Sequence, residues 1–181
     1  MNPATKIKKQ KMKTGKRGKS PRLGQFRGKT VLELSKKVVS WISPYCKKIE
    51  IVGSIRRKVE NPRDVDIVLI PKNSQAKEKL EKLLESKGRK TLGGEKKAYF
   101  KIHGINIELY YTVPEEWGAA LLAYSSKRGS GIGLRIVARL KGFKLSQHGL
   151  FNRKTGKRVA GKTEEEIYHA LGRPYKKPED R

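Results

Sequence analysis

Several things are scarce or missing in this sequence, and each absence excludes a class of protein. Cys46 is the only cysteine, which excludes an internal disulfide or a cysteine-based metal cluster and predicts a reducing intracellular compartment, whether cytoplasm, nucleus or virion. No apolar run approaches the roughly 20 residues that span a bilayer, and no secretory signal follows Met1. Acidic residues number 17 against 44 Lys and Arg, so the formal charge is +27. A polyanion, above all a nucleic acid, is therefore the expected partner.

Acidic residues are completely absent from positions 1–29, which hold 11 Lys or Arg among Gly, Ser and Pro. This composition is typical of a disordered basic tail. Such a tail can act as a solubility or localisation arm, or it can contact phosphates without sequence preference. The sequence does not separate these two roles.

Positions 30–181 alternate between helical and strand-like patterns. Helices are expected at 30–43, with Thr30 as N-cap, and at 74–87, 115–126, 134–142 and 163–172; strands are expected at 48–53, 64–71, 97–103, 105–113 and twice within 143–160. A glycine-rich turn is expected at 128–133. Because short turns join neighbouring strands, the predicted fold class is α+β, with a mixed or antiparallel sheet and helices on one face. We expect an αβ body at 30–122 and a small basic α/β lobe at 123–181.

Two aspartates stand out in the stretch GSIRRKVENPRDVDIVLI, which covers residues 53–70. Residues two apart on a strand point to the same face, so Asp64 and Asp66 should project side by side. Two carboxylates this close repel each other unless a cation lies between them. That cation is either a Lys or Arg of this basic chain or a divalent metal such as Mg²⁺, which prefers oxygen ligands.

Groups that suit a phosphate precede these aspartates. Gly53 lets a backbone N–H approach an anion, Ser54 offers a hydroxyl, and Arg57 offers a guanidinium fork. Glu108, in the apolar strand INIELYY, is the candidate third acid. The alternative for Glu108 is an ordinary place on the wet face of the sheet.

These motifs resemble those of the nucleotidyltransferase superfamily and, more closely, of the family X DNA polymerases, which are the DNA polymerase beta-like enzymes. The segments GSIRR…DVDIVLI, INIELYYTVPEEWGAALLAYSS, LKGFKLSQHGLF and LGRPYKKPEDR occur in the order of that family, and the resemblance covers about residues 30–181. It implies a palm at 30–122 and a thumb at 123–181, without the lyase domain and the fingers domain that most members carry.

The resemblance also implies an activity and a set of site residues. The activity is DNA-directed DNA synthesis, which adds dNMP to a primer 3′-OH in gap-filling repair with two Mg²⁺ ions, for which Mn²⁺ can substitute. Asp64 and Asp66 would hold both metals, and Glu108 would hold the metal at the 3′-OH. Gly53, Ser54 and Arg57 would clamp the triphosphate. The implied partners are primer–template or gapped DNA and a dNTP, with no membrane, and the protein would be a monomer.

Further residues take roles only by this resemblance. Tyr124, Gly131 and His148 fall at nucleotide-binding positions, and the DNA-binding positions are Arg135, Arg139, Lys141 and Lys144. Three departures from the family pattern are visible. The third acid is Glu where the family usually has Asp, the aromatic segment reads Ala-Tyr-Ser-Ser at 123–126, and Gly131 replaces an Asn that often faces the base. His148 is equally compatible with a packing or surface role.

Two other functions remain open from the sequence. One is a different nucleotidyltransferase that extends RNA or works without a template, against which the thumb motifs argue. The other is a non-catalytic nucleic-acid-binding module, against which the intact Asp64, Asp66 and Gly53-Ser54 argue.

The basic tail gives a first testable prediction. Deleting residues 2–20 should weaken DNA affinity and flatten the slope of log affinity against log salt concentration, because fewer counterions are released from the phosphates. Sequence preference should not change, since phosphate contacts carry no direct base information. Fluorescence anisotropy with a labelled duplex at several salt concentrations measures both quantities. An unchanged salt slope would show that the tail does not touch DNA.

Overall fold

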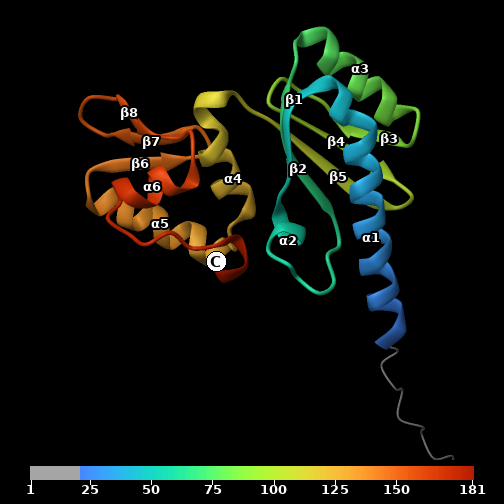
Figure 1. Ribbon diagram of the computed structural model, residues 1–181, viewed down its shortest axis with the longest axis horizontal. Coiled ribbons are helices and arrows are strands. Elements are labelled where there is room, and N and C mark those ends of the chain that lie inside the picture. Colours follow the sequence, from blue (N-terminus) through green and yellow to red (C-terminus); the bar gives the residue numbers. More distant parts are fainter. Residues whose placement is uncertain (1–20) are drawn as a thin grey trace, which may run out of the picture.

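The computed structural model describes residues 21–181, and its first lobe is built on a five-stranded mixed sheet (Figure 1). The strand order is β1-β2-β5-β4-β3, and β2 and β5 are parallel while every other neighbouring pair is antiparallel. The strands are β1 (Cys46–Ile51), β2 (Val65–Pro71), β3 (Arg89–Leu92), β4 (Lys97–Ile102) and β5 (Ile105–Tyr111).

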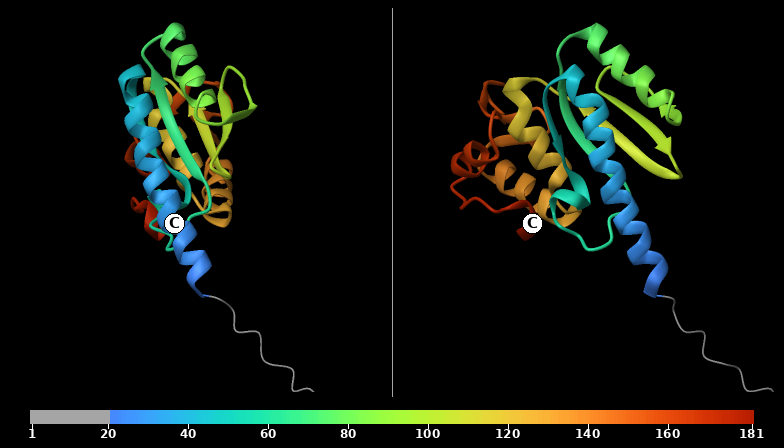
Figure 2. Two further views of the ribbon diagram at one scale, coloured as in Figure 1. Left: turned by 90° about the vertical axis from the view of Figure 1, so that its right-hand side faces the viewer. Right: turned by 45° about the vertical axis from the view of Figure 1, so that its right-hand side comes forward.

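Helices α1 (Pro21–Ile42) and α3 (Ser74–Glu85) cover one face of this sheet (Figure 2). Their apolar residues form the main core together with alternate residues of the strands, among them Ile67, Phe100 and Ile107. The residues in between, which include Asp66 and Glu108, therefore point to the opposite face. This face carries the polar site, and α4 (Trp117–Ser125) packs on part of it through Trp117.

The second lobe follows α4 along the chain (Figure 1). It contains a three-stranded antiparallel sheet in the order β6-β7-β8 and a separate apolar core that joins this sheet to the helices. Its elements are α5 (Arg128–Leu140), β6 (Phe143–Ser146), β7 (Gly149–Asn152), β8 (Arg158–Ala160) and α6 (Glu164–Ala170). Short 3₁₀ turns occur at Ser43–Tyr45, Pro114–Glu116 and Pro178–Asp180.

The α+β class and the mixed sheet are confirmed, and so is the capping box of Thr163 and Glu166 at the start of α6. Several boundaries were wrong. Helix α1 begins at Pro21 and not at an N-cap Thr30, so residues 21–29 of the predicted tail are helical; residues 1–20 lie outside the described part of the chain. The predicted glycine-rich turn at 128–133 is the first half of α5. Strand β3 and the third strand of the second lobe were not predicted.

The first predicted strand ends at Ile51, two residues early, and Gly53 opens the one-turn helix α2 (Gly53–Arg56). Asp64 precedes β2, which begins at Val65, so only Asp66 of the two aspartates lies within the strand. No helix within residues 21–181 is long and apolar enough to cross a membrane.

Gly118 allows the two lobes to approach closely. The backbone N–H groups of Gly118 and Ala119 donate to the carbonyls of Lys162 and Gly161, both at 3.0 Å. A Cβ at Gly118 would collide with the backbone of Thr163, which caps α6. The missing side chain is therefore a condition for the packing of α4 against the second lobe.

We predict that Gly118→Ala lowers the free energy of unfolding by about 1–3 kcal/mol, since a methyl group must be forced against backbone atoms. Gly133→Ala in α5 is the matched control, because a Cβ there meets nothing within 4 Å. The control should raise stability by about 0.5–1 kcal/mol through helix propensity. Urea denaturation of both variants checks this, and a neutral or stabilising Gly118→Ala would contradict the packing argument.

Candidate active site

Two of the three predicted acids are neighbours because of the parallel pairing of β2 with β5. In that register Asp66 lies directly beside Glu108. Asp64 comes two residues before Asp66 and is close enough to interact with it electrostatically. Three carboxylates from the loop before β2, from β2 and from β5 are thus gathered on the face of the sheet opposite α1 and α3.

Gly53 makes room for one of these carboxylates. Its φ of +63° lies in the left-handed region, where a side chain is strained, and a Cβ on it would collide with the Asp66 carboxylate. From the sequence alone, Gly53 is predicted only to let a backbone N–H approach an anion. The structure adds that this glycine is needed for the aspartate to occupy its position.

The predicted phosphate-binding residues share a cavity with the two aspartates. This cavity has a volume of about 410 Å³ and is lined, among others, by Gly53, Ser54, Arg57, Asp64, Asp66 and Tyr124. The guanidinium of Arg57 donates one hydrogen bond, from Nη1 to the carbonyl of Ser125 at 3.1 Å. Its Nε is buried and makes no hydrogen bond to the described residues. Arg57 lines the cavity and its guanidinium carries five N–H donors, so donors other than the buried Nε remain for an anion there.

The acids repel each other in the absence of a bound cation. Burial, followed by the charges of Glu108 and Asp64, raises the pKa of Asp66 to about 6, and Arg57 only partly opposes this shift. Ionised carboxylates in this arrangement are electrostatically costly, and a bound cation would relieve that cost. Carboxylate oxygens are also the ligands that hard divalent cations prefer.

An aromatic cluster that the sequence analysis missed surrounds Glu108. The hydroxyl of Tyr110 donates to Glu108 Oε2 at 2.5 Å, and burial and this hydrogen bond raise the pKa of Tyr110. The Tyr110 ring stacks on Tyr124 with centroids 3.7 Å apart, and Tyr99 meets its edge at 6.3 Å. This contact could have been found in the sequence, because residues two apart on a strand, such as Glu108 and Tyr110, point to the same face.

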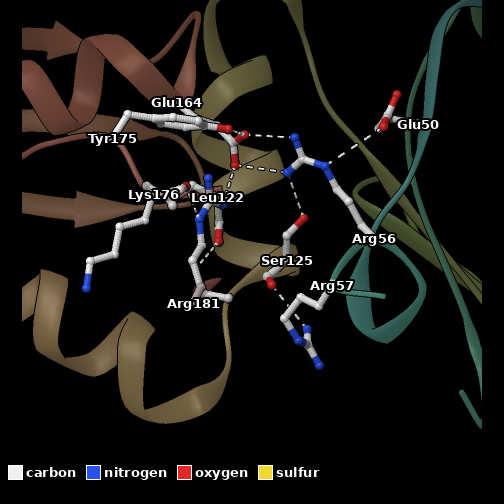
Figure 3. A network of polar contacts seen from close by, with 10 residues as sticks. Glu50, Arg56, Arg57, Leu122, Ser125, Glu164, Tyr175, Lys176 and Arg181 are labelled. Carbon is white, nitrogen blue, oxygen red and sulfur yellow. Dashed lines mark hydrogen bonds and ion pairs between the residues drawn. The ribbon is translucent and has the colours of Figure 1, made fainter. Parts of the chain in front are cut away.

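Arg56, the other arginine of the GSIRR motif, joins the two lobes (Figure 3). Its guanidinium donates to both carboxylate oxygens of Glu164 at 3.0 and 2.8 Å and to Ser125 Oγ at 3.0 Å. Arg181 donates to the same Glu164 at 2.6 Å. Although burial opposes ionisation, these two arginines keep the pKa of Glu164 below its usual range. Arg56 and Arg57 thus bind the same α4 residue: Arg56 binds the hydroxyl of Ser125, and Arg57 binds its backbone carbonyl.

The other predicted residues do not line the cavity of the aspartates. Gly131 and Arg135 line a narrow crevice between α4, α5 and β6. His148 lies in a separate groove, where its Nδ1 is 2.7 Å from Glu116 Oε2. Four predicted DNA-contacting residues are solvent-exposed in the second lobe: Arg135, Arg139, Lys141 and Lys144.

The three acids do not form a ready-made metal site. Among residues 21–181, no group of three or more His, Cys, Asp or Glu side chains converges closely enough to hold a metal ion. One oxygen of Glu108 is bound by Tyr110. The residues still fit a divalent cation by their donor chemistry and by their mutual repulsion, provided that Glu108 turns toward the aspartates.

Comparison with known proteins places this chain among relatives of one kind. Residues 120–181 match the DNA polymerase beta thumb family. The protein named Repair DNA polymerase X from the Warthog/Namibia isolate of African swine fever virus is 27% identical over 166 residues, which cover 88% of this chain and 94% of the relative. Its counterpart from the Pig/Kenya isolate is 28% identical over 142 residues, covering 75% and 82%. These matches confirm the resemblance to family X.

The raised pKa of Asp66 predicts how the stability of the metal-free protein depends on pH. Between about pH 4 and 6 the folded state keeps a proton that the unfolded state has lost, so stability must fall as pH rises through this window. Asp66→Asn removes this dependence and should be more stable than the wild type at pH 8 in EDTA, by up to about 3 kcal/mol.

Urea denaturation in EDTA from pH 4 to 8 measures the difference between the two proteins. Glu33→Gln, which removes a negative charge from an exposed position on α1, is the control and should leave stability and its pH dependence almost unchanged. If Asp66→Asn is less stable than the wild type at pH 8, the acids do not repel each other as described.

Proposed function

We propose that this chain, similar over most of its length to family X repair DNA polymerases, is a DNA-directed DNA polymerase that adds dNMP to a primer 3′-OH. The observation that carries the proposal is the shared cavity: Ser54 and Arg57, which suit a triphosphate, face the same space as Asp64 and Asp66. Acids for metal binding and groups for phosphate binding are what phosphoryl transfer requires of a protein.

Asp64, Asp66 and Glu108 are the residues that would hold the divalent cations, with Mg²⁺ as the expected ion. When bound, such ions activate the attacking hydroxyl and neutralise charge on the triphosphate. The fit rests on the carboxylate oxygens that β2 and β5 place side by side, and burial, followed by the charges of Glu108 and Asp64, raises the pKa of Asp66 to about 6. Glu108 would lie on the side of the primer 3′-OH.

Arg57 and Ser54 would bind the triphosphate and orient it. Arg57 lines the cavity and uses one of its five N–H donors on the carbonyl of Ser125, which fixes its side chain there. A guanidinium with free donors can hold phosphate oxygens with defined geometry. Tyr124 lines the same cavity and would face the sugar or base of the nucleotide.

The exposed face of α5 would contact the DNA. Arg135 and Arg139 lie one turn apart on it, beside a row of exposed apolar residues: Ile132, Ile136 and Leu140. Cations supply affinity for phosphates, and apolar side chains can pack on sugars in a minor groove. With Lys141 and Lys144, this face would hold the duplex near the cavity. Gly131 and His148 stay as proposed nucleotide contacts that would need the lobes to move.

The direct test is primer extension with Mg²⁺ on duplex DNA that carries a one-nucleotide gap. The wild type should add the templated nucleotide, and Asp66→Ala should abolish addition while DNA affinity stays within a few-fold, because affinity comes from dispersed positive charge. Asp180→Ala is a control that removes an exposed acid outside the cavity.

Three results would contradict this proposal. Extension of single-stranded RNA or of an untemplated end in preference to gapped DNA would indicate another nucleotidyltransferase. DNA binding without any addition by the wild type would indicate a non-catalytic module. Full activity of Asp66→Ala would show that the acids do not take part in the chemistry.

A further inference from the structure

Tyr110 occupies one oxygen of the acid that completes the site. Its hydroxyl donates to Glu108 Oε2 at 2.5 Å, the short distance of a hydrogen bond to an ionised acceptor. On the neighbouring strand, Asp66 lies beside the same Glu108. The Tyr110 hydroxyl therefore compensates the negative charge of Glu108. Without this bond, Glu108 would face the carboxylate of Asp66 with no hydrogen-bond donor from β5.

This hydrogen bond competes with metal binding. A lone pair that accepts the Tyr110 proton is not free for a cation, and the carboxylate is held along β5 by a partner two residues further on. The absence of three converging ligands among residues 21–181 is consistent with that restraint. If Glu108 joins Asp64 and Asp66 around an ion through Oε2, it gives up or bends this bond.

Tyr124 holds Tyr110 in the position that makes this bond. The two rings are stacked at 3.7 Å with an interplanar angle of 16°. Tyr124 belongs to α4, and the next residue, Ser125, is bound by Arg56 through its hydroxyl and by Arg57 through its carbonyl. The Tyr110 ring is thus pressed against a fixed wall of the nucleotide cavity.

We propose that Tyr110, braced by Tyr124, is a positioning residue that holds Glu108 back from Asp64 and Asp66 and so weakens metal binding by the protein alone. This inference rests on the proposed function, since it assumes that the three acids bind a divalent cation. The restraint keeps the site incomplete until Glu108 is released.

Binding of Mn²⁺ to the full-length protein without DNA or nucleotide tests the proposal apart from catalysis. Free Mn²⁺ is counted by electron paramagnetic resonance at pH 8. Tyr110→Phe keeps the stacked ring and removes only the hydroxyl, so it should bind Mn²⁺ about tenfold more tightly, as expected for loss of a competing hydrogen bond to a charged group. A merely structural role for Tyr110 would leave the affinity unchanged or lower it, and either result would overturn the proposal.

Three further variants sharpen the test. Tyr99→Phe removes a hydroxyl from the same aromatic cluster. Within residues 21–181 this hydroxyl does not hydrogen-bond to Glu108, so the variant should bind Mn²⁺ like the wild type. Adding Glu108→Gln to Tyr110→Phe should cancel the gain, because the released ligand is lost. Tyr124→Leu leaves the Tyr110 hydroxyl in place but removes the ring stacked on Tyr110, so it should tighten Mn²⁺ binding by a smaller factor than Tyr110→Phe. Unchanged Mn²⁺ affinity would show that Tyr124 does not hold Tyr110 in position.

Asp66→Asn separates failure of this inference from failure of the proposed function. If Asp66→Asn binds Mn²⁺ as well as the wild type, the acids are not the metal site and both proposals fail. If Asp66→Asn loses binding and Tyr110→Phe matches Tyr99→Phe, the metal site holds and only the role of Tyr110 is wrong.

Discussion

The parallel pairing of β2 with β5 is the constraint on which the site depends. It places Asp66 directly beside Glu108, although two carboxylates at neighbouring positions repel each other. Two other features of the first lobe allow this arrangement. Helices α1 and α3 bury the opposite face of the sheet, and the absence of a side chain at Gly53 leaves room for the Asp66 carboxylate. A protein with net charge +27 thus keeps a small cluster of negative charge on one face of this sheet.

A second constraint fixes the walls of the cavity. Arg56 reaches from the first lobe to Glu164 and Ser125, and Arg57 binds the carbonyl of the same Ser125 (Figure 3). Because Glu164 is only 4% exposed and is held by Arg181 as well, the contact between the lobes is charged and shielded from water. The residue before Ser125 is Tyr124, so the network that joins the lobes also positions the ring that lines the cavity of the aspartates and stacks on Tyr110.

The sequence predicted the elements better than their ends. Periodicity revealed α3, β2 and the β4–β5 hairpin, since each has an apolar face that must be buried. It failed at 128–133, where three glycines suggested a turn, although the segment continues into the helical pattern of 134–140 and forms one helix with it. At the site, spacing placed Asp66 correctly but not its pairing with Glu108, which is non-local. Arg56 was missed because its role arises from contact with Glu164, which is distant in sequence. Tyr110 lies only two residues from Glu108, so its place on the same face of β5 was predictable, but its stacking on Tyr124 was not.

The central claim is that Asp64, Asp66 and Glu108 form one metal site beside the nucleotide cavity. Anomalous diffraction from crystals grown with Mn²⁺, gapped DNA and a non-hydrolysable deoxynucleoside triphosphate tests it most directly. We expect anomalous peaks within metal–oxygen bonding distance of all three carboxylates, with the Glu108 carboxylate turned away from Tyr110 and the triphosphate on Arg57. Mn²⁺ bound elsewhere, or bound to the aspartates while Glu108 still accepts the hydrogen bond of Tyr110 and touches no ion, would contradict it.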